Sequence, residues 1–318
     1  MGKSKSCSYG VAMPGLVCFI LLMYASFLAA FLPRLLRRDV DPKVPMIGNL
    51  KTHTTHLALI SSVFVLVVTN FSLAHFCSPG RVPSKFPWDP TKTRSGNEGE
   101  PPQVFQIERK MDGSARYCRI CGKYKPDRTH HCRQCGVCTL EMDHHCPYIR
   151  NCVGFLNHKY FFLVLFYGAI DLILYAVTMR FKFMHAVRNV ITTVDILVLF
   201  MWILAIMFSC LILPFFGFHC WLVVNNFTTL EFCEKLRAKD SKKFKNGQKV
   251  KDVYKVSLFD RGVYTNICHF LGPNPLFWLV PVRWGMSDDG TQIPASRMSI
   301  MKYYKALGLG EPAIKGSA

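Results

Sequence analysis

Residues 118–152 read CRICGKYKPDRTHHCRQCGVCTLEMDHHCPYIRNC, and this stretch holds seven of the fourteen cysteines of the chain. Two cysteine pairs, Cys118 with Cys121 and Cys132 with Cys135, are each separated by two residues, and histidines follow within reach. This spacing is a strong signal of zinc binding, because a structural zinc ion takes four Cys or His ligands in a tetrahedron. One ion would leave too many thiols unused in so short a segment, so the count predicts two zinc ions.

The same count leaves one cysteine over, because two sites of three cysteines and one histidine use only six. The neighbours of Cys146 favour it as the free thiol. Asp143 and His144 precede it, which offers an imidazole to take the thiol proton and a carboxylate to orient that imidazole. Pro147 biases Cys146 toward an extended backbone, and bound zinc would hold the loop rigid. The alternative is that all seven cysteines serve metal, or that one is a spare ligand.

Four stretches are long and apolar enough to cross a bilayer, which takes roughly 20 predominantly apolar residues. They cover residues 9–33, 56–76, 160–179 and 194–224. The first is not a cleaved signal peptide, because its apolar region is too long and no small-residue cleavage site follows it. The predicted fold class is therefore an α-helical integral membrane protein. It has four transmembrane helices and a small two-zinc cysteine-rich domain of short β-hairpins and loops.

The basic residues predict the orientation of these spans. The N-terminus, residues 77–159 and the tail after 225 fall on one side, with 2, 14 and 15 basic residues, whereas the connections 34–55 and 180–193 carry 5 and 3. The positive-inside rule places the richer side in the cytosol, although three arginines directly after the first span argue locally for the reverse. In that reducing compartment, dense cysteines indicate metal or catalysis and not disulfides. A nucleic-acid partner is disfavoured, because membrane spans flank the cluster on both sides.

These inferences divide the chain into ten segments. In order they are a cytosolic leader (1–8), the first helix (9–33), a luminal or extracellular loop (34–55), the second helix (56–76), a cytosolic linker (77–117), the cysteine-rich catalytic domain (118–159), the third helix (160–179), a second luminal or extracellular loop (180–193), the fourth helix (194–224) and a cytosolic C-terminal region (225–318). The leader fits either N-myristoylation at Gly2, with Cys7 beside it for a second acyl group, or no modification. The apolar stretch 274–282 is too short to cross and is expected at the interface or packed on the domain.

The run CRICGKYKPDRTHHCRQCGVCTLEMDHHCPYIRNCVGFLNHKYF, from Cys118 to Phe161, resembles the cysteine-rich domain of the DHHC-type protein S-acyltransferases, or palmitoyltransferases. The four-span layout is also similar to that family. Residues 228–231 (TTLE) resemble its Thr-Thr-x-Glu motif, and the segment around Asn266 resembles its C-terminal aromatic and asparagine element. The sequence departs from the family at Tyr148, where the family most often has tryptophan.

The resemblance implies that Cys146 is the nucleophile that accepts the acyl chain, that His144 is the base, and that Asp143 orients it. It also implies two interleaved zinc sites. One is formed by Cys118, Cys121, His131 and Cys138, and the other by Cys132, Cys135, His145 and Cys152. Three residues correspond to positions where the family contacts coenzyme A phosphates, namely Lys125, Arg128 and His130. For Arg128, packing on the zinc core is the alternative.

By the same resemblance, Thr229 and Glu231 tie the tail to the catalytic domain, and Asn266 is structural. The expected reaction is a two-step transfer. A long-chain acyl-CoA such as palmitoyl-CoA loads Cys146, and a cysteine of a membrane-proximal substrate protein then takes the chain. The expected location is the Golgi or endoplasmic reticulum, or the plasma membrane, with the site facing the cytosol.

Two other classes of protein compete with this interpretation. One is a membrane-tethered zinc module in which Cys146 is inert. The other is an acyltransferase that modifies hydroxyl groups, which normally needs a catalytic histidine inside the membrane; His56 and His219 lie near span ends but in no supporting motif. Asp171 and Asp195 are ionisable groups in apolar surroundings and are functional candidates for that reason.

Overall fold

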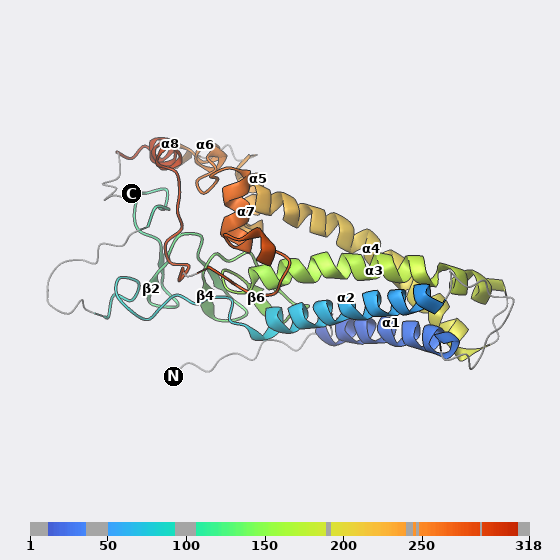
Figure 1. Ribbon diagram of the computed structural model, residues 1–318. Coiled ribbons are helices and arrows are strands. Elements are labelled where there is room, and N and C mark those ends of the chain that lie inside the picture. The colour runs from blue at the N-terminus through green and yellow to red at the C-terminus, as the bar shows by residue number, and fades with distance from the viewer. Residues whose placement is uncertain are drawn as a thin grey trace.

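The computed structural model of the protein describes residues 12–35, 50–92, 106–188, 192–239, 244–245, 248–286 and 288–310. Four long helices run side by side and form the elongated part of the molecule (Figure 1). Their bounds are α1 Ala12–Leu35, α2 Leu50–Phe76, α3 His158–Arg188 and α4 Thr193–Val224. The predicted acylation sites Gly2 and Cys7 lie outside the described residues.

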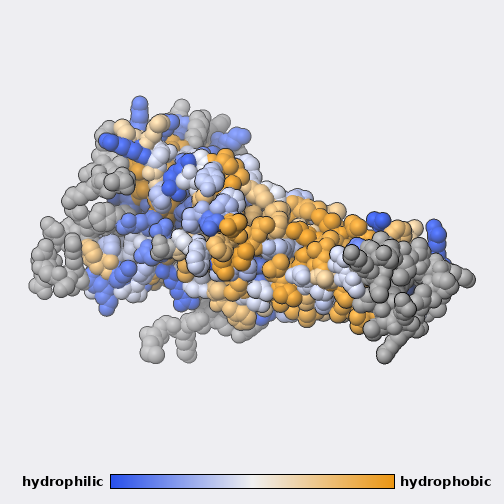
Figure 2. Space-filling view, in the orientation of Figure 1, coloured by the Kyte–Doolittle hydropathy of each residue, from blue (hydrophilic) through white to orange (hydrophobic). Residues whose placement is uncertain are grey.

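Each of the four helices contains a span long and apolar enough to cross a membrane, with a mean hydropathy between 2.1 and 3.0. Hydrophobic residues cover much of the outward face of this bundle (Figure 2). Large apolar side chains point outward; Leu211, for example, is 66% exposed. Such exposure is costly in water and favourable in lipid, so the expectation of four transmembrane helices is confirmed.

The interior of the bundle is apolar but contains a satisfied polar contact between α1 and α3. The hydroxyl groups of Ser26 and Tyr175 lie 2.8 Å apart, and both side chains are buried. The Ser26 hydroxyl also donates to the carbonyl of Met23. Hydroxyl groups inside a bilayer need such partners, so this contact fixes α1 against α3.

The two acidic residues of the bundle differ in their surroundings. Asp195 forms a capping box with Thr192 at the start of α4 and an ion pair of 2.6 Å with Lys182 of α3. It therefore joins α3 to α4 at the end remote from the cysteine-rich segment. Asp171 is 3% exposed, and its Oδ1 has no hydrogen-bond partner among the described residues.

The cysteine-rich segment consists of three short antiparallel hairpins in series. They are β1 Tyr117–Cys118 with β2 Lys123–Tyr124, β3 His130–Cys132 with β4 Val137–Thr139, and β5 His144–Cys146 with β6 Asn151–Val153. Gly122 and Gly136 follow the Cys-x-x-Cys pairs with positive φ angles of 65° and 70°, a conformation that suits glycine. The structure thus contains the short hairpins that the sequence predicted.

The third hairpin is attached to the end of α2. The amide nitrogen of Asn151 donates to the carbonyls of Ala74, His75 and Cys77 over 2.9 to 3.2 Å. The amide of Asn157 donates to Ala74 as well. The last carbonyls of a helix lack partners within the helix, so these two side chains both satisfy α2 and hold the hairpin at the membrane end of the domain.

The C-terminal region lies at the same end of the bundle as the hairpins (Figure 1). Its elements are α5 Thr229–Lys239, β7 Phe244–Lys245, β8 Gln248–Lys249, α6 Val250–Lys255, α7 Val263–Leu271, the 3-10 helix η1 Pro275–Phe277, and α8 Arg297–Leu307. The hydroxyl of Tyr303 in α8 accepts from the backbone nitrogen of Arg109 and donates to its carbonyl. The last helix thereby holds the segment that leads into the first hairpin.

The apolar stretch 274–282 is held on α3 by a buried lysine and by Tyr167, whose hydroxyl donates to the carbonyl of Leu279. Lys159 is 2% exposed, and its ammonium group donates to the carbonyls of Leu271, Phe277 and Val282 over 2.7 to 2.9 Å. An ammonium group with three carbonyl acceptors has all its donors satisfied. The stretch leaves Leu276 82% exposed.

Replacing this lysine should loosen the stretch that it holds. In Lys159→Met, three carbonyls lose a charged donor, and we expect a loss of stability on the order of 2 to 4 kcal/mol. Thermal unfolding in detergent and limited proteolysis between Gly272 and Trp284 measure the effect. Lys302→Met, at an exposed position of α8, is the control. Equal stability of the two variants would contradict this role of Lys159.

Candidate active site

Two groups of four side chains converge on two points of the cysteine-rich domain. They are the same two sets that the family resemblance implied, and the ligand atoms of each set lie within 4.8 Å of one another. The distances from sulfur to the Nδ1 of His131 or His145 range from 3.3 to 3.8 Å. A tetrahedral zinc ion would separate sulfur and nitrogen ligands by about 3.5 Å. The residues present therefore fit two such ions.

Each cluster joins neighbouring hairpins. The first takes Cys118 and Cys121 from the first hairpin, and its other two ligands face each other in the register of the second, where His131 opposes Cys138. The second cluster repeats this arrangement one hairpin further, with His145 opposite Cys152. Very short hairpins have little stability of their own, so the clusters must hold the domain together.

Cys146 belongs to neither cluster. It lies in β5 opposite Asn151, it is 5% exposed, and its side chain is hydrogen-bonded to His144. It belongs to an apolar cluster to which all four helices contribute. The cluster and the residues packed against it include Met13, Leu16 and Val17 of α1, Phe71 and Ala74 of α2, Tyr160, Phe161 and Leu165 of α3, and Ile212 and Phe216 of α4. The thiol thus lies at the boundary between the domain and the interior of the bundle.

His144 connects this thiol to a carboxylate. Its Nδ1 lies 2.6 Å from Oδ2 of Asp143, and its ring stands edge-on to Phe161 at 5.1 Å. Burial alone would lower its pKa, but the hydrogen bonds to Asp143 and Cys146 outweigh burial and raise the pKa of His144 to about 9. An imidazole with this pKa carries its own proton at neutral pH.

Asp143 is completely buried and is held from the C-terminal region as well. The backbone nitrogen of Thr229 donates to its Oδ1 over 2.7 Å, and the Thr229 hydroxyl donates to its Oδ2 over 2.8 Å. Burial would raise the pKa of Asp143, but the nearby His158 and the hydrogen bond from His144 hold it well below its usual range. The expectation that Thr229 ties the tail to the catalytic domain is confirmed.

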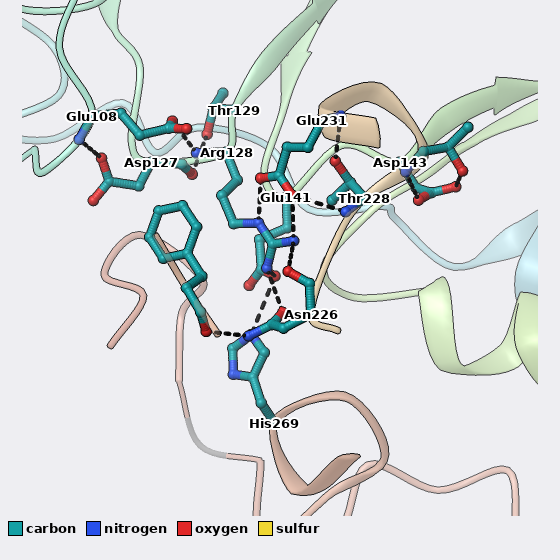
Figure 3. A network of polar contacts seen from close by, with 12 residues as sticks. Glu108, Asp127, Arg128, Thr129, Glu141, Asp143, Asn226, Thr228, Glu231 and His269 are labelled. Atoms are coloured by element: carbon teal, nitrogen blue, oxygen red, sulfur yellow. Dashed lines mark hydrogen bonds and ion pairs between the residues drawn. The ribbon is translucent and has the colours of Figure 1, made fainter. Parts of the chain in front are cut away.

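Arg128 is the second connection to the tail (Figure 3). It is 2% exposed, and its Nε and Nη2 donate to the two carboxylate oxygens of Glu231 over 2.7 and 2.8 Å. The other contacts are to Asn226 and Glu141, and the guanidinium lies over the ring of Phe259. Its donors are thus used inside the protein. None of these contacts is to a residue of the two metal clusters, and Glu231 ties the tail as expected.

The rest of this polar network positions these groups. Glu231 closes a capping box with Thr228, whose backbone nitrogen donates to the carboxylate and whose hydroxyl accepts from the Glu231 backbone. His269 of α7 lies 3.2 Å from Glu141. Asn266 is 1% exposed and donates to the carbonyl of Val224 and to Asp260, so its expected structural role is confirmed.

The other two residues that the resemblance assigned to coenzyme A are Lys125 and His130. Both are half-buried. Burial, followed by the nearby cations Arg116, Lys125 and Arg128, lowers the pKa of His130 to about 3. His130 lines a cavity of about 260 Å³. Further basic side chains that line it are Arg109, Lys110, Arg116 and Lys235.

Two histidines that the sequence did not assign also reach the site. Nε2 of His158, the first residue of α3, lies 3.8 Å from Oδ1 of Asp143. His219 of α4 joins Asp143 and His158 in a third cluster, in which Asp143 and His219 are buried and His158 is half-buried. The available signal was a polar residue near the end of each apolar helix, which by itself does not show what the side chain faces.

A thiol beside an imidazole and carboxylate pair, at the end of four membrane helices and next to two metal-binding clusters, defines a membrane-embedded thiol enzyme. Residues 112–236 match the DHHC palmitoyltransferase family. Palmitoyltransferase ZDHHC15 of Rattus norvegicus is 34% identical over 260 residues, which cover 77% of this chain and 73% of that protein. The probable protein S-acyltransferase 16 of Arabidopsis thaliana is 32% identical over 233 residues, or 70% and 75% of the two chains. Palmitoyltransferase ZDHHC2 of Homo sapiens is 37% identical over 188 residues, or 58% and 48%.

The chain therefore belongs to the DHHC palmitoyltransferase family. It is an acyltransferase of the protein S-palmitoylating type.

The buried position of Arg128 generates a stability prediction. Arg128→Met leaves Glu231 without its cation and leaves Glu141 with only His269, and breaking a buried ion pair on one side costs about 3 to 5 kcal/mol. Arg128→Met combined with Glu231→Gln should recover part of this loss, because the unpaired charge on Glu231 is then removed. Unfolding in detergent measures both effects, and the exposed Arg133→Met serves as the control. A double variant no more stable than Arg128→Met alone would argue against the pair.

Proposed function

We propose that Cys146 is the nucleophile of a two-step acyl transfer, and the observation that carries this proposal is its position outside both metal clusters and beside His144. In the first step the Cys146 sulfur bonds to the acyl carbon of palmitoyl-CoA and the bond to the coenzyme A sulfur breaks. The proton held by His144 goes to the departing thiolate. In the second step a substrate cysteine attacks the acyl-enzyme, its proton passes to His144, and Cys146 leaves as the thiolate.

Asp143 serves this cycle as the orienting group. Its hydrogen bond to Nδ1 turns the other nitrogen of the His144 ring toward reacting groups, and its charge stabilises the imidazolium. Thr229 holds the carboxylate with two hydrogen bonds. The C-terminal region therefore completes the catalytic group that the cysteine-rich domain begins.

The two metal ions are proposed to be structural zinc. Each cluster offers four Cys and His ligands, the number that closes a tetrahedral site and leaves no position for a substrate. When bound, zinc would supply only the fixed spacing of the three hairpins. The reacting groups are all side chains of the protein.

The acyl chain is proposed to lie between the four helices, because apolar residues from each of them pack together next to Cys146. Coenzyme A is proposed to lie on the domain, near Lys125 and His130. The adjacent cavity supports this, because its four basic side chains outnumber its three carboxylates, Glu108, Glu231 and Glu234, and suit the phosphates of the carrier. Arg128 is left out of this contact, since its donors are used internally.

The proposed acceptors are cysteines of membrane-proximal proteins at the cytosolic face. The support for this orientation is the excess of basic residues on that side of the spans. We propose the Golgi, the endoplasmic reticulum or the plasma membrane as the location.

Incubation of the purified protein with a fluorescent palmitoyl-CoA tests the nucleophile. The wild type should acquire a label that neutral hydroxylamine removes, because a thioester is labile to it. Cys146→Ser and Cys146→Ala should acquire no such label, and their zinc content should stay at two ions per chain, as expected for a residue outside both clusters. Cys138→Ala is the matched variant, since it should lose one zinc ion. Retention of the label, or loss of zinc, in the Cys146 variants would favour the inert zinc module.

The coenzyme A contact predicts a different kinetic signature. Lys125→Glu should raise the KM for palmitoyl-CoA roughly ten-fold, which corresponds to about 1.4 kcal/mol of binding free energy, with kcat nearly unchanged. The effect should shrink at high salt, because the contact is between charges. Steady-state rates measured across acyl-CoA concentrations give both constants, and the exposed Lys92→Glu is the control. A fall in kcat at constant KM would place Lys125 elsewhere.

A further inference from the structure

Three imidazoles surround the one carboxylate of the active site. His144 bonds to Oδ2 of Asp143, Nε2 of His158 lies 3.8 Å from Oδ1, and a ring nitrogen of His219 lies within 4.8 Å of both Asp143 and His158. Asp143 is completely buried and His219 is 1% exposed. The catalytic mechanism described above uses only His144. The other two imidazoles come from membrane helices, not from the cysteine-rich domain.

Aromatic packing fixes both of these rings. The ring of His158 stands edge-on to Phe270 of α7 at 4.6 Å. Around His219, Phe161, Phe215 and Phe218 stand edge-on at 5.3, 4.7 and 5.7 Å. The orientations of both imidazoles beside the buried carboxylate are therefore determined by the packing of the protein.

His219 in particular needs an explanation. Its Nε2 is buried and has no hydrogen-bond partner among the described residues. Burying a polar nitrogen without a partner costs free energy, and native proteins rarely retain such a group without a use. The adjacent charge of Asp143 provides one, because a low-dielectric interior strengthens the attraction between a polar N–H group and a carboxylate.

A third metal ion fits this cluster less well than a purely protein arrangement. A tetrahedral ion would draw nitrogen and oxygen ligands to about 3.3 Å of each other, whereas His158 and Asp143 stand 3.8 Å apart. Both oxygens of Asp143 already accept hydrogen bonds, from Thr229 and His144. Oδ1 is therefore only partly available as a ligand.

We infer that His158 and His219 are positioning residues that hold the Asp143 carboxylate from the membrane side. This inference rests on the role proposed above for Asp143 and His144. His144 binds the carboxylate from the domain, and Thr229 binds it from the tail. The two imidazoles of α3 and α4 limit its rotation on the remaining side. The carboxylate then keeps its direction toward Nδ1 of His144 while the charge of that ring changes during the cycle.

The same arrangement ties the catalytic pair to the helices that would hold the acyl chain. Phe161 of α3 stands edge-on to both His144 and His219, at 5.1 and 5.3 Å, and packs in the apolar cluster that contains Cys146. A change in the packing of α3 against α4 would therefore shift Phe161 and His219, and through them the position of Asp143. Replacing either histidine should therefore change the rate of the acylation step and leave the affinity for acyl-CoA unchanged.

The test replaces each histidine in the full-length protein with phenylalanine, which keeps the ring, and with glutamine, which restores an N–H donor. Acylation of Cys146 by fluorescent palmitoyl-CoA is followed in single turnovers and at steady state. His158→Phe and His219→Phe should lower kcat roughly ten- to hundred-fold, the range for a slightly misplaced catalytic group, with KM nearly unchanged. The glutamine variants should recover much of that rate.

The matched control is His185→Phe, a histidine of α3 near the end remote from the site. It should leave both constants unchanged. Equal rates for the phenylalanine and glutamine variants at either position, whether both fast or both slow, would overturn the positioning role. A metal content of three ions per chain that falls to two in His219→Phe would also overturn it, in favour of a metal site. Failure of the proposed function is distinguishable, because wild-type protein would then acquire no label at Cys146.

Discussion

The structure depends on a carboxylate from which water is fully excluded. A buried charge is costly unless it is paired and hydrogen-bonded, so Asp143 requires its partners. Those partners come from separate parts of the chain: His144 from the third hairpin, Thr229 from the segment after α4, and His158 from α3. The cysteine-rich domain therefore cannot complete its own active site. The membrane helices and the tail must be in place before the carboxylate is satisfied.

Arg128 is a second buried charge, of opposite sign, whose partners also come from separate parts of the chain. It lies in the turn that leads to the second hairpin, and its acceptors are Glu231 of α5, Asn226 beyond α4 and Glu141 of the domain itself. Two buried charges of opposite sign thus attach the tail to the domain, one at Thr229 and one at Glu231, only two residues apart in sequence. These contacts explain the Thr-Thr-x-Glu pattern, because its second threonine donates hydrogen bonds to Asp143 and its glutamate pairs with Arg128.

The features that could be predicted from the sequence are those that counting and spacing determine. Four apolar stretches of membrane length gave the four helices. The count gave one cysteine more than two sites need, and the neighbours Asp143, His144 and Pro147 indicated that it is Cys146. The role of Arg128 could not be predicted, because a basic residue in a loop can face either solvent or a buried acid. Lys159 and His219 were missed for a related reason. Their partners lie far away in sequence, on α7 and η1 for Lys159 and on the third hairpin for His219, and only tertiary packing brings them together.

In the acyl transfer proposed above, the position of Cys146 would meet two opposing requirements of thioester chemistry. An acyl-enzyme must be protected from water, and the 5% exposure of Cys146 against apolar residues of all four helices provides that protection. A second thiol must nevertheless reach the same carbon. Two residues further on, Tyr148 is 53% exposed, so the loop that follows the nucleophile opens outward while the nucleophile faces inward. An amphipathic aromatic residue at this point suits the edge of a bilayer, and tyrosine retains that property where the family most often has tryptophan. The hairpin can therefore shield the thioester on one face and receive an acceptor from the membrane surface on the other.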